Sequence, residues 1–518
     1  MTVSIAPAAV RAMLLTREEI ALIDLREEAR FALAHPLFAA QLSAGRIEDE
    51  AWERIPRRSV TLVLYDDGEG LVEDAAARFG AIGYTDVRAL EGGLAGWRDA
   101  GYELFQDVNS YSKAFGELVE HRRHTPSLSA PEVQALIHEQ ADIRIVDARR
   151  FDEYATMSIP TGTSVPGAEL VLRAPALAPD PATTIIVNCA GRTRSIIGTQ
   201  SLINAGVANR VVALRNGTIG WTLAGQELAL GQGREAPEPG GDEESTARAR
   251  ARAVAYRAGV RHVDAAEAAH LAHDAGRTLY RFDVRTAAEY AAGHLPGFLH
   301  APGGQLVQET DMRAPVRGAR ILLADPRGVR ADMTASWLAQ MGWEVYVLDT
   351  GDAGAIETGF PERVRPPLPD VATIDAAAAA SFPRDRIVDL ASSRAHRAGH
   401  IPGARFAMPV ALAAALAALP GGAPVLLTSP DGALAAYAAA RLADPRLRVL
   451  AGGTAAWQAA GGAIETGLAD PLSPVEDIYK RPYEGTDNAA AAMQAYLDWE
   501  YGLVAQLERD ATHGFVVI

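Results

Sequence analysis

The sequence predicts an α/β protein made of four repeated domains, each a mostly parallel sheet flanked by helices, with a partly helical C-terminal tail. Short apolar strands alternate with alanine-rich helical stretches, a pattern typical of βαβ units. The same landmarks recur four times along the chain at a long period. The length of 518 residues also exceeds what one hydrophobic core supports, so several domains are expected.

Two landmarks keep a constant distance in every copy. The first is an acidic residue at the end of a strand, and the second is the first residue of the loop that follows a later strand. In chain order, the pairs are Asp24 and Asp66, Asp147 and Cys189, Asp283 and Asp325, and Asp389 and Ser429. The separation is 42 residues in the first three copies and 40 in the fourth. Chance would not keep this register, so the four segments repeat one unit.

The repeats set the expected domain limits. They predict domains at residues 1–108, 109–235, 251–368 and 369–468, a linker at 236–250 and a tail at 469–518. The stretch 231–245 is rich in Gly, Pro and Glu, which is typical of a flexible linker, and it would separate two pairs of domains. In the tail, residues 489–509 carry apolar side chains at helical spacing, and we expect a helix there that docks on a domain.

Composition excludes several classes of function. The formal net charge of −16 argues against nucleic acid or an anionic membrane as a general partner. No apolar stretch approaches the ~18 residues of a membrane span, and the first residues do not resemble a secretory signal. A single cysteine rules out an intramolecular disulfide and a cysteine-rich zinc site. We therefore expect a cytoplasmic protein without a bound metal.

The single cysteine lies at a position suited to a nucleophile. The apolar run 185–187 predicts a buried strand, and the residues after Ser195 predict a helix, so Cys189 falls in the turn between them. Arg192 and Arg194 share that turn. A helix N-terminus and two arginines would lower the pKa of the thiol from ~8.5 by roughly two units. The sequence thus predicts a reactive thiolate. The alternative is a buried cysteine that acts only as a small hydrophobic side chain.

Three motifs resemble the rhodanese family of sulfurtransferases, over about four-fifths of the chain. The motif Asp-x-Arg…Glu-Tyr occurs at 147–154 and 283–290, and Gly-His-Ile/Leu-Pro-Gly at 293–297 and 399–403. The motif Cys-x-Gly-x-x-Arg-Ser occurs once, at 189–195. The resemblance implies four rhodanese-like domains, of which only the second is catalytic. It also implies a substrate-binding loop whose N–H groups encircle the sulfur, formed by Ala190, Gly191, Arg192, Thr193, Arg194 and Ser195.

The implied activity is that of a sulfurtransferase of the EC 2.8.1 class. Cys189 would take a sulfane sulfur from a small anionic donor, such as thiosulfate, a persulfide or mercaptopyruvate, and become a persulfide. A thiol, cyanide or sulfite would then accept the sulfur, and a protein acceptor is an alternative. This double displacement needs no metal and no organic cofactor. Because the chain has no second cysteine, the resolving nucleophile must come from outside.

The surrounding residues have less specific roles. Arg194 is favoured over Arg192 as an anion ligand, because the family's loop ends in that arginine. Ser195 either caps the helix or donates a hydrogen bond to the sulfur. Asp147 and Arg149 are expected to support the end of the strand. Trp221 is expected in the core rather than in the wall of the substrate site, although both interpretations stay open.

Two alternatives belong to other classes. A cysteine-dependent phosphatase would need five residues between cysteine and arginine to admit phosphate, and only four separate Cys189 from Arg194. A persulfide carrier or sulfur-responsive scaffold would hold sulfur for a dedicated partner with little turnover of small molecules. Domains one, three and four lack the cysteine, so they must serve structure or binding. We expect domain one to pack against domain two and to shape its pocket.

Overall fold

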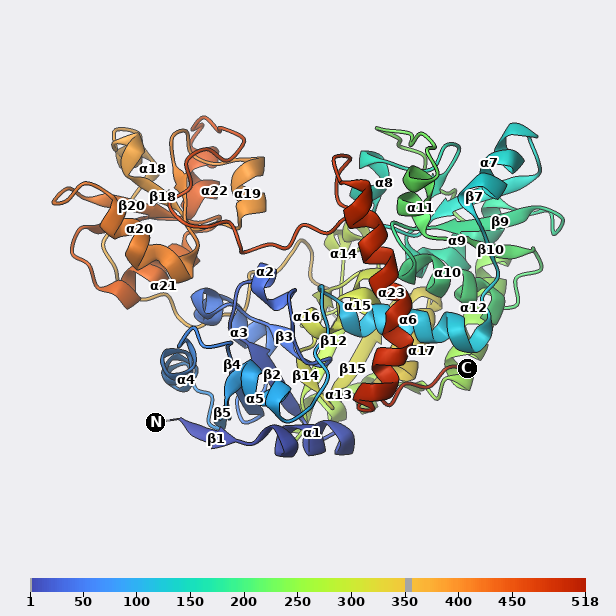
Figure 1. Ribbon diagram of the computed structural model, residues 1–518, viewed down its shortest axis with the longest axis horizontal. Helices are drawn as coiled ribbons and strands as arrows, with labels where there is room; N and C mark the ends of the chain where they lie inside the picture. Colours follow the sequence, from blue (N-terminus) through green and yellow to red (C-terminus); the bar gives the residue numbers. More distant parts are fainter. Residues whose placement is uncertain (1, 350–355) are drawn as a thin grey trace. The chain divides into compact units, whose positions relative to one another are not determined.

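The computed structural model describes residues 2–349 and 356–518, in two compact bodies (Figure 1). The first body comprises residues 2–9, 21–108 and 362–480, and the second comprises 10–20, 109–349, 356–361 and 481–518. Most of the first domain and the whole fourth domain lie in the first body. The second and third domains lie in the second body, together with three connecting helices. These helices are α6 (Ser110–Arg123), α12 (Gly241–Arg257) and α23 (Ala490–Asp510).

The second domain is a five-stranded sheet with the order β6-β10-β9-β7-β8, in which all pairs are parallel. Its strands are β6 (Ser127–Leu128), β7 (Ile143–Asp147), β8 (Thr163–Ser164), β9 (Thr184–Asn188) and β10 (Val211–Leu214). Its helices are α7 (Ala130–His138), α8 (Phe151–Thr156), α9 (Leu170–Leu177), α10 (Thr193–Asn204) and α11 (Gly217–Leu223). Successive residues of β9 point to opposite faces. Ile185 and Val187 therefore join one core cluster and Ile186 joins another.

The third domain repeats this topology with the order β11-β16-β15-β12-β13. The strands are β11 (Arg261–Val263), β12 (Leu279–Asp283), β13 (Leu299–His300), β15 (Arg320–Ala324) and β16 (Glu344–Leu348), with a short β14 (Val316–Arg317) before β15. The helices are α13 (Ala265–His273), α14 (Ala287–Ala292), α15 (Gly303–Gln308), α16 (Thr310–Arg313) and α17 (Val329–Gln340). The common strand order confirms that the sequence repeats are structural repeats.

The first domain has the strand order β1-β5-β4-β2, with β3 beside β2. Its elements are β1 (Val3–Ile5), α1 (Pro7–Thr16), β2 (Ile20–Asp24), α2 (Glu28–Phe31), β3 (Ala40–Gln41), α3 (Ile47–Arg54), β4 (Thr61–Tyr65), α4 (Val72–Ala81), β5 (Val87–Leu90) and α5 (Gly93–Asp99). Here too the predicted acid, Asp24, ends a strand, and Asp66 follows β4 directly.

The fourth domain has the order β17-β21-β20-β18-β19. Its strands are β17 (Thr373–Ile374), β18 (Ile387–Asp389), β19 (Arg405–Phe406), β20 (Val425–Thr428) and β21 (Leu447–Leu450). Its helices are α18 (Ala376–Ala379), α19 (Ser393–Ala398), α20 (Leu412–Ala418), α21 (Ala433–Leu442) and α22 (Gly453–Ala459). In all four domains the predicted acid ends a strand, and the residue at the position of Cys189 begins the loop after a neighbouring strand.

The predicted linker is wrong where α12 forms. This helix begins at Gly241, within the stretch expected to be flexible, and has three acids in its first turn and Arg257 in its last. Those charges suit the helix dipole. Ala247, Ala251 and Val254 are buried in the core cluster of the second domain. Small side chains on one face let the helix pack closely, so residues 241–250 belong to the folded second body.

The third domain shares a body with the second and packs against it. Val329 and Met333 of α17 enter the core cluster that contains Val187 of β9. A buried ion pair adds to this contact, with Arg330 Nε 2.9 Å from Glu169 Oε1. The apolar face of α17 therefore gives the second domain a neighbour that the sequence analysis did not name. The expected packing of domain one against domain two stays a prediction.

The C-terminal helix docks as predicted. In α23, Met493, Tyr496 and Leu497 are buried and join a cluster that also contains Ala190 of the cysteine loop. Figure 1 shows α23, in red, lying against α6. The tail thus contributes to the surroundings of the predicted site.

Candidate active site

Cys189 lies at the carboxyl end of β9, in the loop that leads into α10. Its side chain is only 2% exposed, and Sγ donates a hydrogen bond to Ser195 Oγ at 3.4 Å. Ser195 Oγ in turn donates to the backbone oxygen of Arg192 at 2.8 Å. Ser195 lies inside α10 and does not cap it, because the helix begins at Thr193 without a side-chain cap; its hydroxyl contacts the sulfur instead.

The loop of the third domain has a carboxylate where the second has its cysteine. Asp325 accepts hydrogen bonds from the backbone N–H of Arg327 at 3.1 Å and of Arg330 at 2.9 Å. Free N–H groups at the start of a helix attract negative charge. The third domain therefore holds its own anion in this loop.

The first domain has the same arrangement. Asp66 accepts from the N–H of Gly68 at 3.1 Å and from that of Leu71 at 2.6 Å. In both domains the donors lie two and five residues after the loop position. The matching residues after Cys189 are Gly191 and Arg194. Gly191 and Arg194 thus occupy the positions whose N–H groups bind the carboxylate in the other two loops.

Both arginines of the loop are paired with carboxylates. Arg194 donates from Nη1 and Nη2 to Glu153, at 2.7 and 2.9 Å. Arg192 donates from Nε and Nη2 to Glu117 of α6, each at 2.8 Å, and also to Glu120. The two positive charges on which the sequence argument relied are therefore largely neutralised.

The predicted lowering of the thiol pKa is wrong for this closed site. Burial raises the pKa of Cys189, since it removes water that would solvate the thiolate. The charge of Arg194 and hydrogen bonding by Ser195 oppose this effect, and a negative charge on Glu500 adds to it. Sequence reasoning counted the arginines but had no means of seeing their partners.

The C-terminal helix explains the glycine at position 191. Gly191 does not have a positive φ, so backbone strain does not account for it. A Cβ at this position would lie 3.1 Å from Glu500 Oε2 and 3.2 Å from Tyr496 Cε1. The close approach of α23 therefore favours a residue without a side chain.

Glu500 is a buried carboxyl group beside the loop, 1% exposed. Its Oε1 accepts a hydrogen bond from the Tyr496 hydroxyl at 2.9 Å, while Oε2 has no hydrogen-bond partner among the described residues. Burial raises the pKa of Glu500 to about 8; the negative charge of Glu117 adds to this shift and Lys113 opposes it. The Lys113 ammonium lies 5.0 Å from the centre of the Tyr496 ring.

Asp147 and Arg149 support the loop from the neighbouring strand, as expected. Arg149 donates to both oxygens of Asp147, from Nε at 2.9 Å and from Nη2 at 2.7 Å. Arg149 Nη2 also donates to the backbone oxygen of Met157 at 2.5 Å. Asp147 Oδ2 accepts from Asn188 Nδ2 at 2.9 Å, directly before the cysteine. Both charged side chains are 1% exposed and act within the fold.

Comparison with known proteins gives the family. The model of the rhodanese-like domain matches residues 6–100, 129–224, 264–354 and 374–460. The chain belongs to the rhodanese family. Each match covers one of the four domains, and the second contains the Cys189 loop. None of the curated proteins matches the chain.

Solved structures include a similar chain over its whole length. The crystal structure of thiosulfate sulfurtransferase from Pseudomonas aeruginosa is 55% identical, with all of each chain covered and a TM-score of 0.96. Two others are similar over one domain. The Alr3790 protein from Anabaena sp. is 20% identical over 21% of this chain and 86% of that one, with a TM-score of 0.20. The BH2092 protein from Bacillus halodurans is 21% identical over 24% of this chain and 92% of that one, with a TM-score of 0.20. The rhodanese domains and the first of these structures support a sulfurtransferase.

Trp221 does not reach the cysteine loop of this rhodanese domain. Its side chain is fully buried in the core cluster that contains Ile186, and its Nε1 donates to the backbone oxygen of Glu227 at 2.9 Å. The loop is instead fixed by the start of α11, where the Thr218 N–H donates to Cys189 O and the Ile219 N–H donates to Ala190 O, at 2.9 and 3.0 Å. Trp221 thus anchors α11 in the core.

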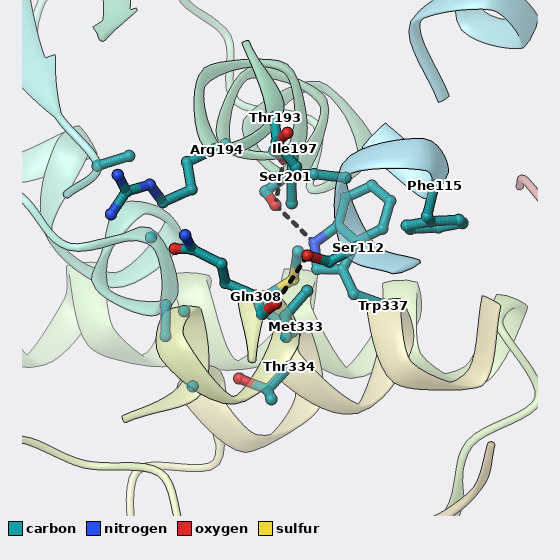
Figure 2. Close-up of a pocket in the computed structure, with 17 residues that line it drawn as sticks. Ser112, Phe115, Thr193, Arg194, Ile197, Ser201, Gln308, Met333, Thr334 and Trp337 are labelled. Atoms are coloured by element: carbon teal, nitrogen blue, oxygen red, sulfur yellow. Dashed lines mark hydrogen bonds between the residues drawn. The ribbon is translucent and has the colours of Figure 1, made fainter. Parts of the chain in front are cut away.

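Thr193 and Arg194 also line a small cavity, of about 40 Å³, between the second and third domains (Figure 2). Trp337 donates from Nε1 to Ser201 Oγ at 2.8 Å on one side of it. Gln308 and Thr334 come from α15 and α17 on the third domain's side. This volume holds a few water molecules at most. The cavity is therefore a packing feature behind the loop.

Sequence reasoning missed the carboxylates and the helix around the loop. Glu117 and Glu120 of α6 and Glu500 of α23 lie outside the repeats, so no motif marks them. One signal was present for Glu500, which stands four residues after Tyr496 on the predicted apolar face of the helix. A charged residue on such a face is expected to have a partner or a function.

The described residues contain no cluster of three or more His, Cys, Asp or Glu side chains that could hold a metal ion. In the same part of the chain, each helix is too short or too polar to cross a membrane.

Proposed function

We propose that this protein transfers sulfane sulfur from thiosulfate to a thiophilic acceptor through a persulfide on Cys189. The observation that supports the proposal is the residue that each domain has at the loop position of Cys189. The loops of domains one and three are filled by the carboxylates of Asp66 and Asp325, whereas the second has a thiol in the same N–H ring. Thiosulfate is proposed as donor because the 55% identical structure is that of a thiosulfate sulfurtransferase.

The chemistry follows in two displacements. The Cys189 thiolate attacks the outer sulfur of thiosulfate, the S–S bond of the donor breaks, and sulfite leaves with the bonding electron pair. The outer sulfur now carries the negative charge of the persulfide. Hydrogen bonds from the N–H groups of Gly191 and Arg194 would stabilise it, as the equivalent groups stabilise Asp325. The acceptor then attacks that sulfur, and the Cys189 thiolate is released.

Burial shapes the first step. Because the pKa of Cys189 is raised, the thiol form prevails below that pKa, and donor turnover is expected to increase with pH until the thiol is ionised. The paired Arg194 remains the cation that favours the thiolate. We propose it as the main positive charge felt by the donor, with Arg192 fixing the loop to α6.

Mass spectrometry tests the proposal. Incubation with thiosulfate should add one sulfur atom, about 32 Da, to Cys189, and sulfite should be released in equal amount. The variant Cys189→Ser should show neither, because the chain has no other cysteine. The variant Asp325→Asn serves as the matched control for the same position in a domain without cysteine. Sulfite release by Cys189→Ser would refute the one-site mechanism. Rates with mercaptopyruvate and glutathione persulfide would rank the donors.

A persulfide carrier is the second candidate, and the burial of the loop under α23 favours it. Cys189 and Ala190 are each 2% exposed, which limits the access of small acceptors. A carrier would form a stable persulfide from thiosulfate but turn over slowly with cyanide, sulfite and thiols alike. An enzyme would release the sulfur to at least one of them in many cycles.

A further inference from the structure

The carboxyl group of Glu500 has a free oxygen inside the protein. Its side chain is 1% exposed, and Oε2 has no hydrogen-bond partner in the described part of the chain. Burying a polar group without a partner is costly, so such an atom calls for an explanation, for example a bound water, ion or ligand or a role in catalysis. The Cys189 chemistry described above does not use this group.

Geometry directs Oε2 toward the cysteine loop. This atom lies 3.1 Å from the point that a Cβ on Gly191 would occupy, closer than a normal van der Waals contact. A negative charge on Glu500 is also near enough to raise the pKa of Cys189. The free oxygen therefore lies beside the loop that receives the sulfur donor.

The charges around Glu500 keep it neutral. Burial raises the pKa of Glu117 to about 7, but Arg192 donates two hydrogen bonds to it, each at 2.8 Å, so Glu117 loses its proton before Glu500 does. On Glu500, Oε1 accepts a hydrogen bond from the neutral hydroxyl of Tyr496. The charge of Lys113 lowers the pKa of Glu500 but does not outweigh the effect of burial. Since two carboxylates share this buried site, the proton belongs on Glu500. Its free oxygen can then carry the O–H and act as a donor.

We propose that Glu500 is an active-site residue supplied by the C-terminal helix, and that its neutral carboxyl group donates a hydrogen bond from Oε2 to the anionic sulfur donor in the Cys189 loop. This inference rests on the proposed sulfur transfer through Cys189. It assigns α23 a part in donor binding that none of the four rhodanese domains can supply. No proton is transferred, because the carboxyl group only donates the hydrogen bond.

The proposal has a defined dependence on pH. Below about pH 8 Glu500 is protonated and donates to the anion. Above that pH the carboxylate loses the donated hydrogen bond and repels thiosulfate, so kcat/KM for the donor should fall. Glu117, Lys113, Arg192 and Tyr496 are the titratable groups facing it, and Arg192 stays charged throughout. Burial also raises the pKa of the Cys189 thiol, so the rise from thiol ionisation overlaps this range, and the decline caused by Glu500 becomes visible once that rise is complete.

The test compares two substitutions in the full-length protein. Glu500→Gln keeps an N–H donor without a titrating proton, so activity at neutral pH should stay within about threefold and the alkaline decline should disappear. Glu500→Met removes the donor and should raise KM for thiosulfate at least about tenfold at neutral pH, with a smaller change in kcat. The matched control is Glu508→Gln, an exposed glutamate on the same helix, which should match the wild type.

The outcomes separate this proposal from the proposed function. Sulfite release and Cys189 persulfide in the wild type, with Glu500→Gln keeping the wild-type alkaline decline, would overturn the role of Glu500. If Glu500→Met detaches α23, limited proteolysis will reveal it, and the pH profile of Glu500→Gln then decides. A wild-type protein that forms no persulfide would instead refute the sulfur transfer itself.

Discussion

Arg194 and Glu153 form an ion pair with two hydrogen bonds, at 2.7 and 2.9 Å, and Arg330 and Glu289 of the third domain repeat it at the same distances. The sequence separation is 41 residues in both pairs. The third domain has no cysteine in its loop, so catalysis does not explain why the pair is there. The pair therefore belongs to the scaffold that holds the loop, and in the second domain the charge of its arginine also favours the Cys189 thiolate.

Removing the charge of Arg194 should raise the pKa of Cys189. Arg194→Gln removes the positive charge that favours the thiolate and leaves Glu153 with Arg150 at 3.6 Å, so the thiol pKa should rise by at least about one unit. The double variant Arg194→Gln/Glu153→Gln removes both charges and should change the pKa less. The rate of alkylation by iodoacetamide as a function of pH measures both. Equal pH profiles for the single variant and the wild type would contradict the claim that the charge of Arg194 lowers the pKa of Cys189.

Glu153 should make the second domain sensitive to acid. Burial alone would raise its pKa, but Arg194 lowers it to about 2. A depressed folded-state pKa adds stability above the ordinary value near 4.5, and this is lost as pH falls toward 2. The shift corresponds to roughly 3 kcal/mol. The thermal midpoint of Glu153→Gln should therefore vary less between about pH 5 and 3, whereas the exposed Glu139→Gln should follow the wild type.

A methyl group at position 191 should displace the C-terminal helix. In Gly191→Ala the new Cβ would lie 3.1 Å from Glu500 Oε2, so Glu500 and the helix that carries it have to give way by a few tenths of an ångström. Alkylation of Cys189 should become several-fold faster, and α23 more sensitive to proteases. Gly502→Ala is the control on the helix itself, because no atom lies within 4 Å of its Cβ position. This control should leave alkylation unchanged and stabilise the helix by about 0.5–1 kcal/mol.

Arg330 should be essential for the contact between the second and third domains. It is fully buried, and its Nε lies 2.9 Å from Glu169 Oε1, while two further bonds reach Glu289. Arg330→Met leaves Glu289 without its ion-pair partner and Glu169 with Arg173 alone, and should cost about 3–5 kcal/mol. The thermal midpoint of the variant should recover in part when Glu169→Gln is added. A loss that this second change does not reduce would show that packing alone is responsible.

Much of the fold was predictable because its signals are local or periodic. The strand-ending acids, the loop after the second strand and the constant spacing of 42 residues mark four copies without any contact information. The helix at the C-terminus followed from apolar residues at helical spacing. The exact domain limits, such as 109–235 for the second domain, stay predictions.

The linker shows where local signals fail. Gly, Pro and Glu between residues 231 and 245 favour flexibility, yet α12 forms from Gly241 because its alanines bury themselves in the core of the second domain. The contact between the second and third domains has a similar cause. No local signal marks it, because it depends on the fit of α17 against the second domain.

The sequence alone determined that the protein has one nucleophilic position, Cys189, in one of four sibling loops. Tertiary structure decided how that position behaves. Arg192 meets Glu117 across 75 residues of sequence, and Glu500 of the tail meets Gly191. These contacts neutralise the arginines, exclude water and raise the pKa of the thiol, in the direction opposite to the prediction. The physical reason is that residue types set which charges are available, whereas only the packed fold sets their distances and their access to water.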